Sequence, residues 1–193
     1  MEINFEKRYV LIYALIIAAT HHIVNNINSI YSNVINNIWP IDTIILVFTL
    51  LLLSIFNRNQ KQRIALGIIY KKSPFENAYK YIKKDNRISV DCEKIRNLVN
   101  ISNKSFYAEY YKPVSDNKLV KSKNSEFCVI RDIVFTTFII LVTMTIFTII
   151  WHDIFYKELI ASIIAYFIGI LACRMKAKDL VTQVIVENIY KGG

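Results

Sequence analysis

Glycine and proline are scarce in this sequence of 193 residues, with only four and three copies. So few turn-forming residues exclude a collagen-like or low-complexity chain. Cysteine is also rare, and Cys92, Cys128 and Cys173 form an odd set without a CxxC spacing. This pattern indicates neither a disulfide framework nor a zinc knuckle, so we expect three reduced thiols.

Positive charge is absent from a long N-terminal stretch. No lysine or arginine occurs between Arg8 and Arg58, although the chain carries 24 of them and a formal net charge of +9. Hydrophobic residues make up 54% of the sequence. So apolar a chain, with so long a stretch lacking cations, is typical of a membrane protein and not of a soluble enzyme.

Four apolar segments are long enough, or nearly so, to cross a bilayer core, which takes about 20 helical residues. We predict spans at about 9–27, 40–56, 133–151 and 158–175. Trp39 and Trp151 lie where an interfacial aromatic belt is expected. The predicted fold is an all-α integral membrane protein with four transmembrane helices and a small basic domain between the second and third.

Lysine and arginine mark the cytoplasmic side of a membrane protein. Seventeen of them lie from Arg58 to Arg131, and Lys157 is the one cation predicted on the outer side. Both termini are therefore predicted in the cytoplasm. A cleaved signal peptide is the alternative for the first segment, because Lys7-Arg8 precedes an apolar core with small residues near Ala18.

This orientation divides the chain into four predicted parts. A transmembrane hairpin with an outer amphipathic stretch covers 1–56, and a basic cytoplasmic domain covers 57–132. A second hairpin covers 133–175, and a cytoplasmic tail covers 176–193.

Polar residues near the outer ends of the spans are candidates for sensing a signal or lining a pore. Histidine in a helix bundle also serves as an ordinary hydrogen-bonded packing residue, so that alternative is open. The candidates are His21, His22, Asn25, Asn26 and His152.

Small and hydroxylated residues on the last two spans indicate close helix contacts. Ala161, Ala165 and Gly169 repeat at intervals of four, a pattern that lets another helix backbone approach closely. Thr137 and Thr148 can bond their own helix or a neighbour. We predict that these five residues contribute to a homo-oligomer, for which a tetramer is one candidate.

The segment 57–132 carries 17 cations against eight acids and so favours an anionic partner. The anionic lipid of the inner leaflet is the first candidate and an effector protein another. Ser73-Pro74-Phe75-Glu76 forms a capping box that predicts a helix from Pro74 to about Lys84. The predicted docking residues are Lys80, Lys83, Lys84 and Arg87. Tyrosines interleaved with lysines also suit nucleic-acid stacking, but amphipathic helices beneath a membrane share this composition, and we expect no direct nucleic-acid contact.

Further elements of this segment are less regular. Asp91 is placed to cap a second helix whose apolar side comprises Ile95, Leu98 and Val99. Between 101 and 120 we predict a short helix or strand followed by a loop, because Pro113 ends any helix there. Residues 118–124 are predicted to form an exposed basic linker.

Catalytic chemistry has no candidate residues in this segment. It contains no histidine, no Walker loop and no GxGxxG, and its acids show no paired-carboxylate spacing. We therefore expect a protein that is not an enzyme and that uses no cofactor or metal.

The overall plan resembles small membrane subunits of bacterial antiphage defence systems. The shared features are the length, the four spans with both ends inside, the basic domain between spans two and three, and a bias toward Asn, Ile and Lys. In plan the chain is similar to the membrane subunit of the Kiwa system. This resemblance implies an oligomeric sensor of the inner membrane that docks a cytoplasmic effector. Four-span effectors of cyclic-nucleotide defence systems are similar too, and they imply a gated pore that depolarises the cell.

Overall fold

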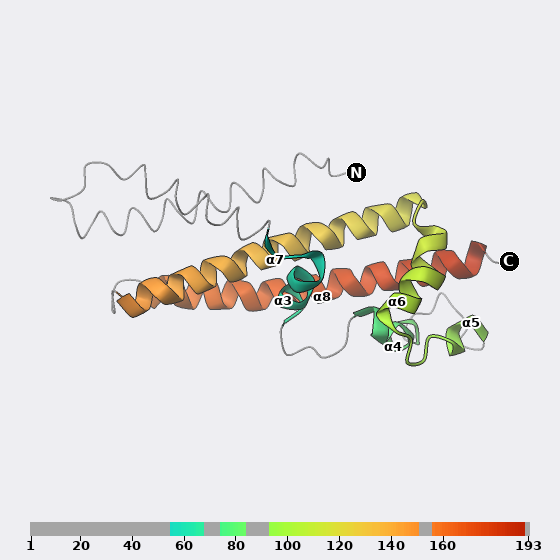
Figure 1. Ribbon diagram of the computed structural model, residues 1–193, viewed down its shortest axis with the longest axis horizontal. Coiled ribbons are helices and arrows are strands. Elements are labelled where there is room, and N and C mark those ends of the chain that lie inside the picture. The colour runs from blue at the N-terminus through green and yellow to red at the C-terminus, as the bar shows by residue number, and fades with distance from the viewer. Residues whose placement is uncertain (1–54, 68–73, 84–92, 151–155, 192–193) are drawn as a thin grey trace. The chain divides into compact units, whose positions relative to one another are not determined.

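Helices account for all regular structure in the residues that the computed structural model describes, which are 55–67, 74–83, 93–150 and 156–191 (Figure 1). The predicted all-α class is confirmed for this part of the chain. The predicted spans at about 9–27 and 40–56 lie outside it, except for Ile55 and Phe56. In chain order the elements are α3 (Arg58–Ala65), η1 (Pro74–Asn77), α4 (Ala78–Ile82), α5 (Glu93–Arg96), α6 (Asn103–Phe106), η2 (Tyr107–Tyr111), η3 (Lys112–Val114), α7 (Lys118–Ile150) and α8 (Tyr156–Lys191).

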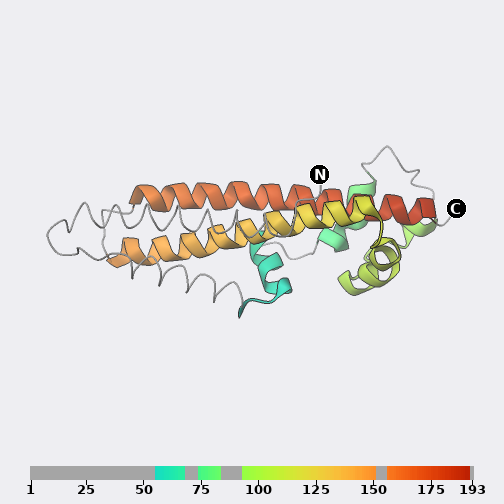
Figure 2. The same ribbon diagram turned by 90° about the horizontal axis from the view of Figure 1, so that it is seen from above.

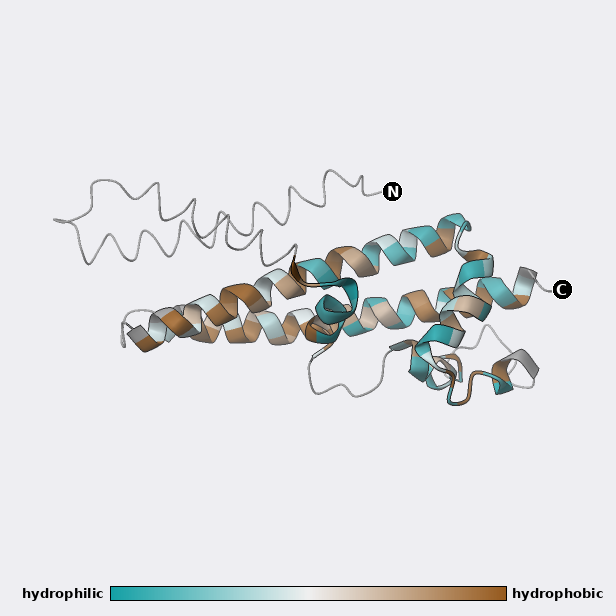
Figure 3. Ribbon diagram, in the orientation of Figure 1, coloured by the Kyte–Doolittle hydropathy of each residue, from teal (hydrophilic) through white to brown (hydrophobic). Residues whose placement is uncertain are grey.

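Helices α7 and α8 are longer than a membrane requires. They contain 33 and 36 residues, so at 1.5 Å per residue each is about 50 Å long, against a hydrocarbon core of about 30 Å. By length and composition, each holds a stretch able to cross a membrane, within Lys118–Ile146 and Leu159–Tyr190. The longest apolar runs lie in the second half of α7 and the first half of α8 (Figure 3). The charged halves of both helices therefore extend beyond the apolar segments.

The predicted boundaries at 132 and 175 both fall inside these helices. Residues 118–124 are helical, so the prediction of a linker there is wrong. Residues 176–191 continue α8 instead of forming a separate tail. The chain divides into two compact units, namely unit 1 (Met1–Ala65 and Arg131–Gly169) and unit 2 (Leu66–Ile130 and Ile170–Gly193). The predicted tail thus belongs to the same unit as most of the predicted basic domain.

Unit 1 combines α3 with the apolar halves of α7 and α8. Asn57 and Gln60 form a reciprocal cap at the start of α3, each side-chain oxygen accepting from the other's backbone N–H at 2.9 Å. Near the end of α3, the hydroxyl of Tyr166 donates to the carbonyl oxygen of Ile64 at 2.8 Å. The ring of Phe56 lies 5.1 Å from that of the buried Phe135. These contacts attach the short helix to both long ones.

Unit 2 has an apolar core to which α8 contributes much of its last half. Within this unit α7 and α8 lie side by side (Figures 1 and 2). Burial of large side chains supplies the main stabilisation, about 1.5–3 kcal/mol for each fully buried one. The buried residues include Ile82, Ile95, Leu98, Phe106, Val114, Val120 and Phe127 from the first part of the unit, and Ala177, Leu180, Val181, Val184 and Ile185 from α8.

The short helices of unit 2 agree in part with the sequence predictions. The helix expected from Pro74 is present as η1 followed by α4, although its first turn is a 3-10 helix. In the second predicted helix Ile95 and Leu98 are buried as expected, but Val99 is 51% exposed. Its backbone leaves the helix after Arg96, and Asn100 adopts a φ of 61° that ends the turn. Residues 103–114 are helical throughout, so the strand alternative is wrong.

Candidate functional site

The structure describes only some of the predicted functional residues. Lys80 and Lys83 lie in or next to α4, and the five predicted interface residues lie on α7 and α8. The remaining predicted docking and sensing residues lie outside the described residues. These are His21, His22, Asn25, Asn26, Lys84, Arg87 and His152.

Lys80 and Lys83 are both exposed, on a helix whose other face is buried. Ala78 and Ile82 are inaccessible to solvent and hold α4 against the core of unit 2. The ring of Phe75, in the preceding turn, lies 5.3 Å from the ring of Phe106. The core therefore fixes this helix so that its lysines point toward solvent, where they can meet an anionic surface.

A π-helix, η2, follows α6 and carries the tyrosines that the sequence groups together. The Phe106 and Tyr110 rings stack at 5.6 Å in the core, while Tyr107 is exposed and stacks on Tyr111 at 5.2 Å. The amide of Asn188 donates to the carbonyl oxygens of Glu109 and Tyr110 at 3.2 and 3.1 Å. Since a π-turn weakens the regular helical bonding, this contact from α8 satisfies carbonyls at the turn.

A second polar contact joins α8 to the start of α7. Asn117 caps α7 by accepting from the N–H of Leu119 at 2.8 Å, and its side-chain amide donates to Glu187 at 2.6 Å. Glu187 also accepts from Gln183 at 2.9 Å. None of these residues was among the predicted site residues. Their signal is the apolar periodicity of Ala177, Leu180, Val184 and neighbours, which continues the helical pattern past the predicted end of the span.

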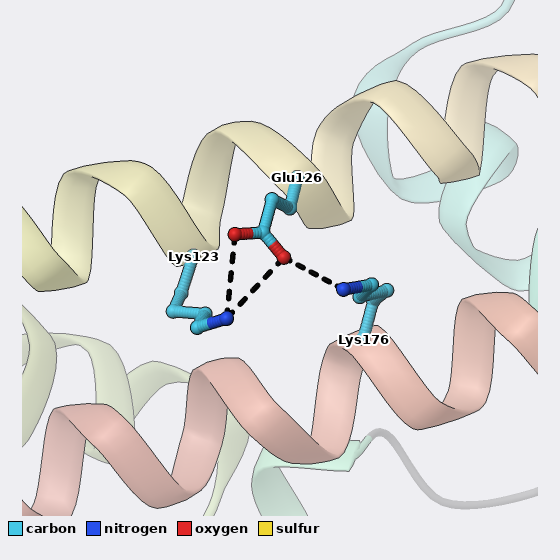
Figure 4. A network of polar contacts seen from close by, with 3 residues as sticks. All are labelled: Lys123, Glu126 and Lys176. Atoms are coloured by element: carbon cyan, nitrogen blue, oxygen red, sulfur yellow. Dashed lines mark hydrogen bonds and ion pairs between the residues drawn. The ribbon is translucent and has the colours of Figure 1, made fainter. Parts of the chain in front are cut away.

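An ion cluster links the charged halves of the two long helices (Figure 4). Glu126 accepts hydrogen bonds from Lys176 at 2.7 Å and from Lys123 at 3.3 and 3.4 Å. All three residues are charged and lie outside the apolar runs 133–150 and 159–173. The hydrogen bond from Lys176, opposed by partial burial, lowers the pKa of Glu126, and the same bond raises the pKa of Lys176. Both directions favour the ionised pair.

The predicted small-residue face divides into two parts. A Cβ atom on Gly169 would lie 2.9 Å from Cγ2 of Val134, so Gly169 lets α8 approach α7 within one chain. Ala161 and Ala165 are exposed and leave that part of the face open to another molecule or to lipid. Of the two threonines, Thr137 donates to the carbonyl of Ile133 at 3.0 Å and Thr148 to that of Met144 at 2.8 Å.

Two features could serve a function: the exposed Lys80 and Lys83 on helix α4, whose other face is buried, and the continuation of α7 and α8 into apolar segments. Within residues 55–67, 74–83, 93–150 and 156–191, no group of three metal-ligating side chains is close enough to hold a metal ion. No protein-family model, curated protein or solved structure matches this chain.

Proposed function

We propose that this chain is a homo-oligomeric membrane subunit that senses a change at or beyond the bilayer and relays it to a cytoplasmic effector. Antiphage defence in a bacterial inner membrane is the setting that its overall plan implies. Four spans, with both termini in the cytoplasm, place unit 2 on the effector's side.

The unbroken course of α7 and α8 is the observation that carries this proposal. Each helix is continuous from its apolar run to residues that are buried in unit 2. A shift or rotation of an apolar segment therefore moves residues that hold unit 2 together, such as Leu180 and Ile185. Coupling of this kind is carried well by rigid helices.

Exposed apolar side chains on α8 support a membrane location. Phe167, Ile168, Leu171 and Met175 are each at least 60% exposed, which is a costly arrangement in water but a favourable one against lipid or another subunit. Ala161 and Ala165 lie on the same exposed segment and are where we place the contact between copies.

Docking through Lys80 and Lys83 can be tested by phage challenge. Cells would express the chain together with its neighbouring genes, as wild type, as Lys80→Gln/Lys83→Gln, or as the control Lys118→Gln/Lys121→Gln. All four lysines are exposed in unit 2, so the two variants remove equal charge. We expect the first variant to lose defence at normal membrane levels and the control to keep it. Equal behaviour of the two variants would contradict docking at α4.

A potential-sensitive dye separates the relay from a gated pore. If the chain relays a signal, cells that express it alone keep their membrane potential when challenged. Depolarisation by the chain alone would favour the pore. Orientation is tested separately, since a cysteine at position 33 should react in intact cells and Cys92 only after permeabilisation. Labelling of Cys92 in intact cells would overturn the proposed topology.

A further inference from the structure

Arg131 is an almost completely buried cation at the point where the apolar half of α7 begins. Its side chain is 9% exposed, and Ile133 starts the apolar run two residues later. Nε and Nη2 donate to the same oxygen of Asp132 at 2.8 and 2.7 Å. Nη1 is fully enclosed and has no acceptor within the described part of the chain. Burying a donor of a charged group without an acceptor costs free energy. An additional oxygen that accepts a hydrogen bond from Nη1 would remove this cost.

A second cation, Lys61 of α3, lies near the same part of α7. Its ammonium nitrogen is 5.8 Å from the centre of the Phe135 ring, one turn after Arg131 on α7. Burial is the main cause that lowers the pKa of Lys61, while Asp132 raises it and Arg131 lowers it further. Both neighbours are therefore close enough to act on Lys61 electrostatically. Among the described residues, Arg131, Lys61 and Asp132 together carry a net charge of +1.

The position of this cluster favours one class of anion. If α7 crosses the bilayer as proposed above, residues just before Ile133 lie at the level of the lipid headgroups. The phosphodiester of a phospholipid carries a charge of −1, which would neutralise the +1 charge of Arg131, Lys61 and Asp132. Arginine binds phosphate oxygens through a planar fork, and lysine adds a point charge.

We propose that Arg131 and Lys61 bind the phosphate group of one membrane phospholipid at the cytoplasmic end of α7. Lys61 is only half-buried, so we place the phosphate on its side of the cluster. Nη1 of Arg131 is enclosed, so the proposal requires the guanidinium to reorient toward the phosphate. Asp132 competes with the phosphate for Arg131. The site rests on the proposed membrane location of α7. Its residues belong to unit 1, whereas the exposed lysines of α4 belong to unit 2.

Lipid retention on the full-length chain, purified in a non-ionic detergent, tests the site. Native mass spectrometry would count bound phosphatidylglycerol, phosphatidylcholine and diacylglycerol over a range of lipid concentrations. We expect one phospholipid of either kind to bind and diacylglycerol, which lacks the phosphate, to be lost. Arg131→Gln and Lys61→Gln should each weaken binding about tenfold or more, since a charged hydrogen bond contributes about 1.5–3 kcal/mol and 1.4 kcal/mol is tenfold. Lys118→Gln, an exposed cation elsewhere on α7, should bind as the wild type does.

Asp132→Asn gives the sharpest result, because it removes the competing carboxylate and should tighten phospholipid binding. A merely structural role for the Arg131–Asp132 pair predicts the opposite. Far-UV circular dichroism and gel filtration would show whether each variant folds. If Arg131→Gln does not fold, Lys61→Gln still tests the site, because it leaves Arg131 and its ion pair with Asp132 intact.

Three results would overturn the site. These are unchanged binding in both cation variants, weaker binding in Asp132→Asn, and equal occupancy by inorganic phosphate, which would make it a free-anion site. Carbonate extraction of membranes tests the location independently. A chain that stays in extracted membranes but retains no phospholipid at Arg131 refutes this site alone, whereas release of the chain refutes the proposed function.

Discussion

Lys176 of α8 donates a hydrogen bond to Oε2 of Glu126 on α7 across 2.7 Å. The two residues are 50 positions apart in the sequence and lie on the charged halves of the long helices. Lys123, one turn before Glu126, adds a weaker contact to the same carboxylate. The carboxylate therefore holds the two helices together at a level where two lysines would otherwise repel each other.

Glu126→Gln should destabilise the protein modestly and in a pH-dependent way. The pKa of Glu126 is lowered below 4.5 in the folded state, so the pair stabilises the fold above about pH 4.5 and this contribution is lost as the pH falls through the folded pKa. A partly exposed pair contributes up to about 1 kcal/mol, or up to about 4 °C in Tm for a chain of this size. Thermal unfolding in detergent at pH 7 and pH 3.5 would measure the difference between wild type and variant.

The matched control is Asp116→Asn, because Asp116 pairs with Lys121 in an exposed position at 3.1 Å. Its Tm should change less than that of Glu126→Gln at pH 7. A Tm difference for Glu126→Gln that persists unchanged at pH 3.5 would show that the ionised pair is not the cause.

Gly169→Ala should weaken the packing of α8 on α7 within one chain. The added methyl group would lie 2.9 Å from Cγ2 of Val134, and overpacking of this kind typically costs about 1–3 kcal/mol. Val134→Ala alone should also destabilise, but the double variant should recover part of the loss from Gly169→Ala. Denaturation of the purified variants checks this. Simple additivity of the two changes would mean that the side chains do not meet.

Ile185→Ala tests whether the last half of α8 belongs to the core of unit 2. Ile185 is inaccessible to solvent, and removing such a side chain costs about 2–5 kcal/mol. Trypsin should then cut the lysine-rich part of unit 2 much faster, while the protein still enters the membrane fraction. Tyr190→Ala, at a position 68% exposed, is the control and should be cut at the wild-type rate. Equal rates for both variants would support a separate tail.

Ala161→Ile/Ala165→Ile should shift the protein toward smaller species if these exposed residues contact another copy. Branched side chains at these two exposed positions would prevent close helix approach. Mass photometry in mild detergent measures the change. Ile164→Leu, an exposed neighbour altered without a change in volume, should keep the wild-type mass. An unchanged mass in the double variant would assign the alanine face to lipid.

The helical class, the apolar halves of α7 and α8, and the helix that begins at Pro74 follow from the sequence by itself. Each depends on neighbouring residues: an apolar run about 20 residues long, or a proline in the first turn followed by apolar residues at helical spacing. Burial of Ile95 and Leu98 was predictable for the same reason. Local patterns also identified Lys80 and Lys83 as polar positions on an amphipathic helix.

Which helix faces meet, and where the compact units end, depends on contacts between residues that are far apart in the sequence. The charges at 176 and 178 predicted the end of a span, but α8 continues past them because its later residues, such as Leu180 and Ile185, are buried in the core of unit 2. Gly169 contacts Val134 within the chain. The spacing of Gly169 from Ala161 and Ala165 does not show whether such a contact forms within one chain or between two copies. Glu126 with Lys176, and Asn117 with Glu187, are contacts between residues far apart in sequence, and no local pattern encodes the distance between two helices.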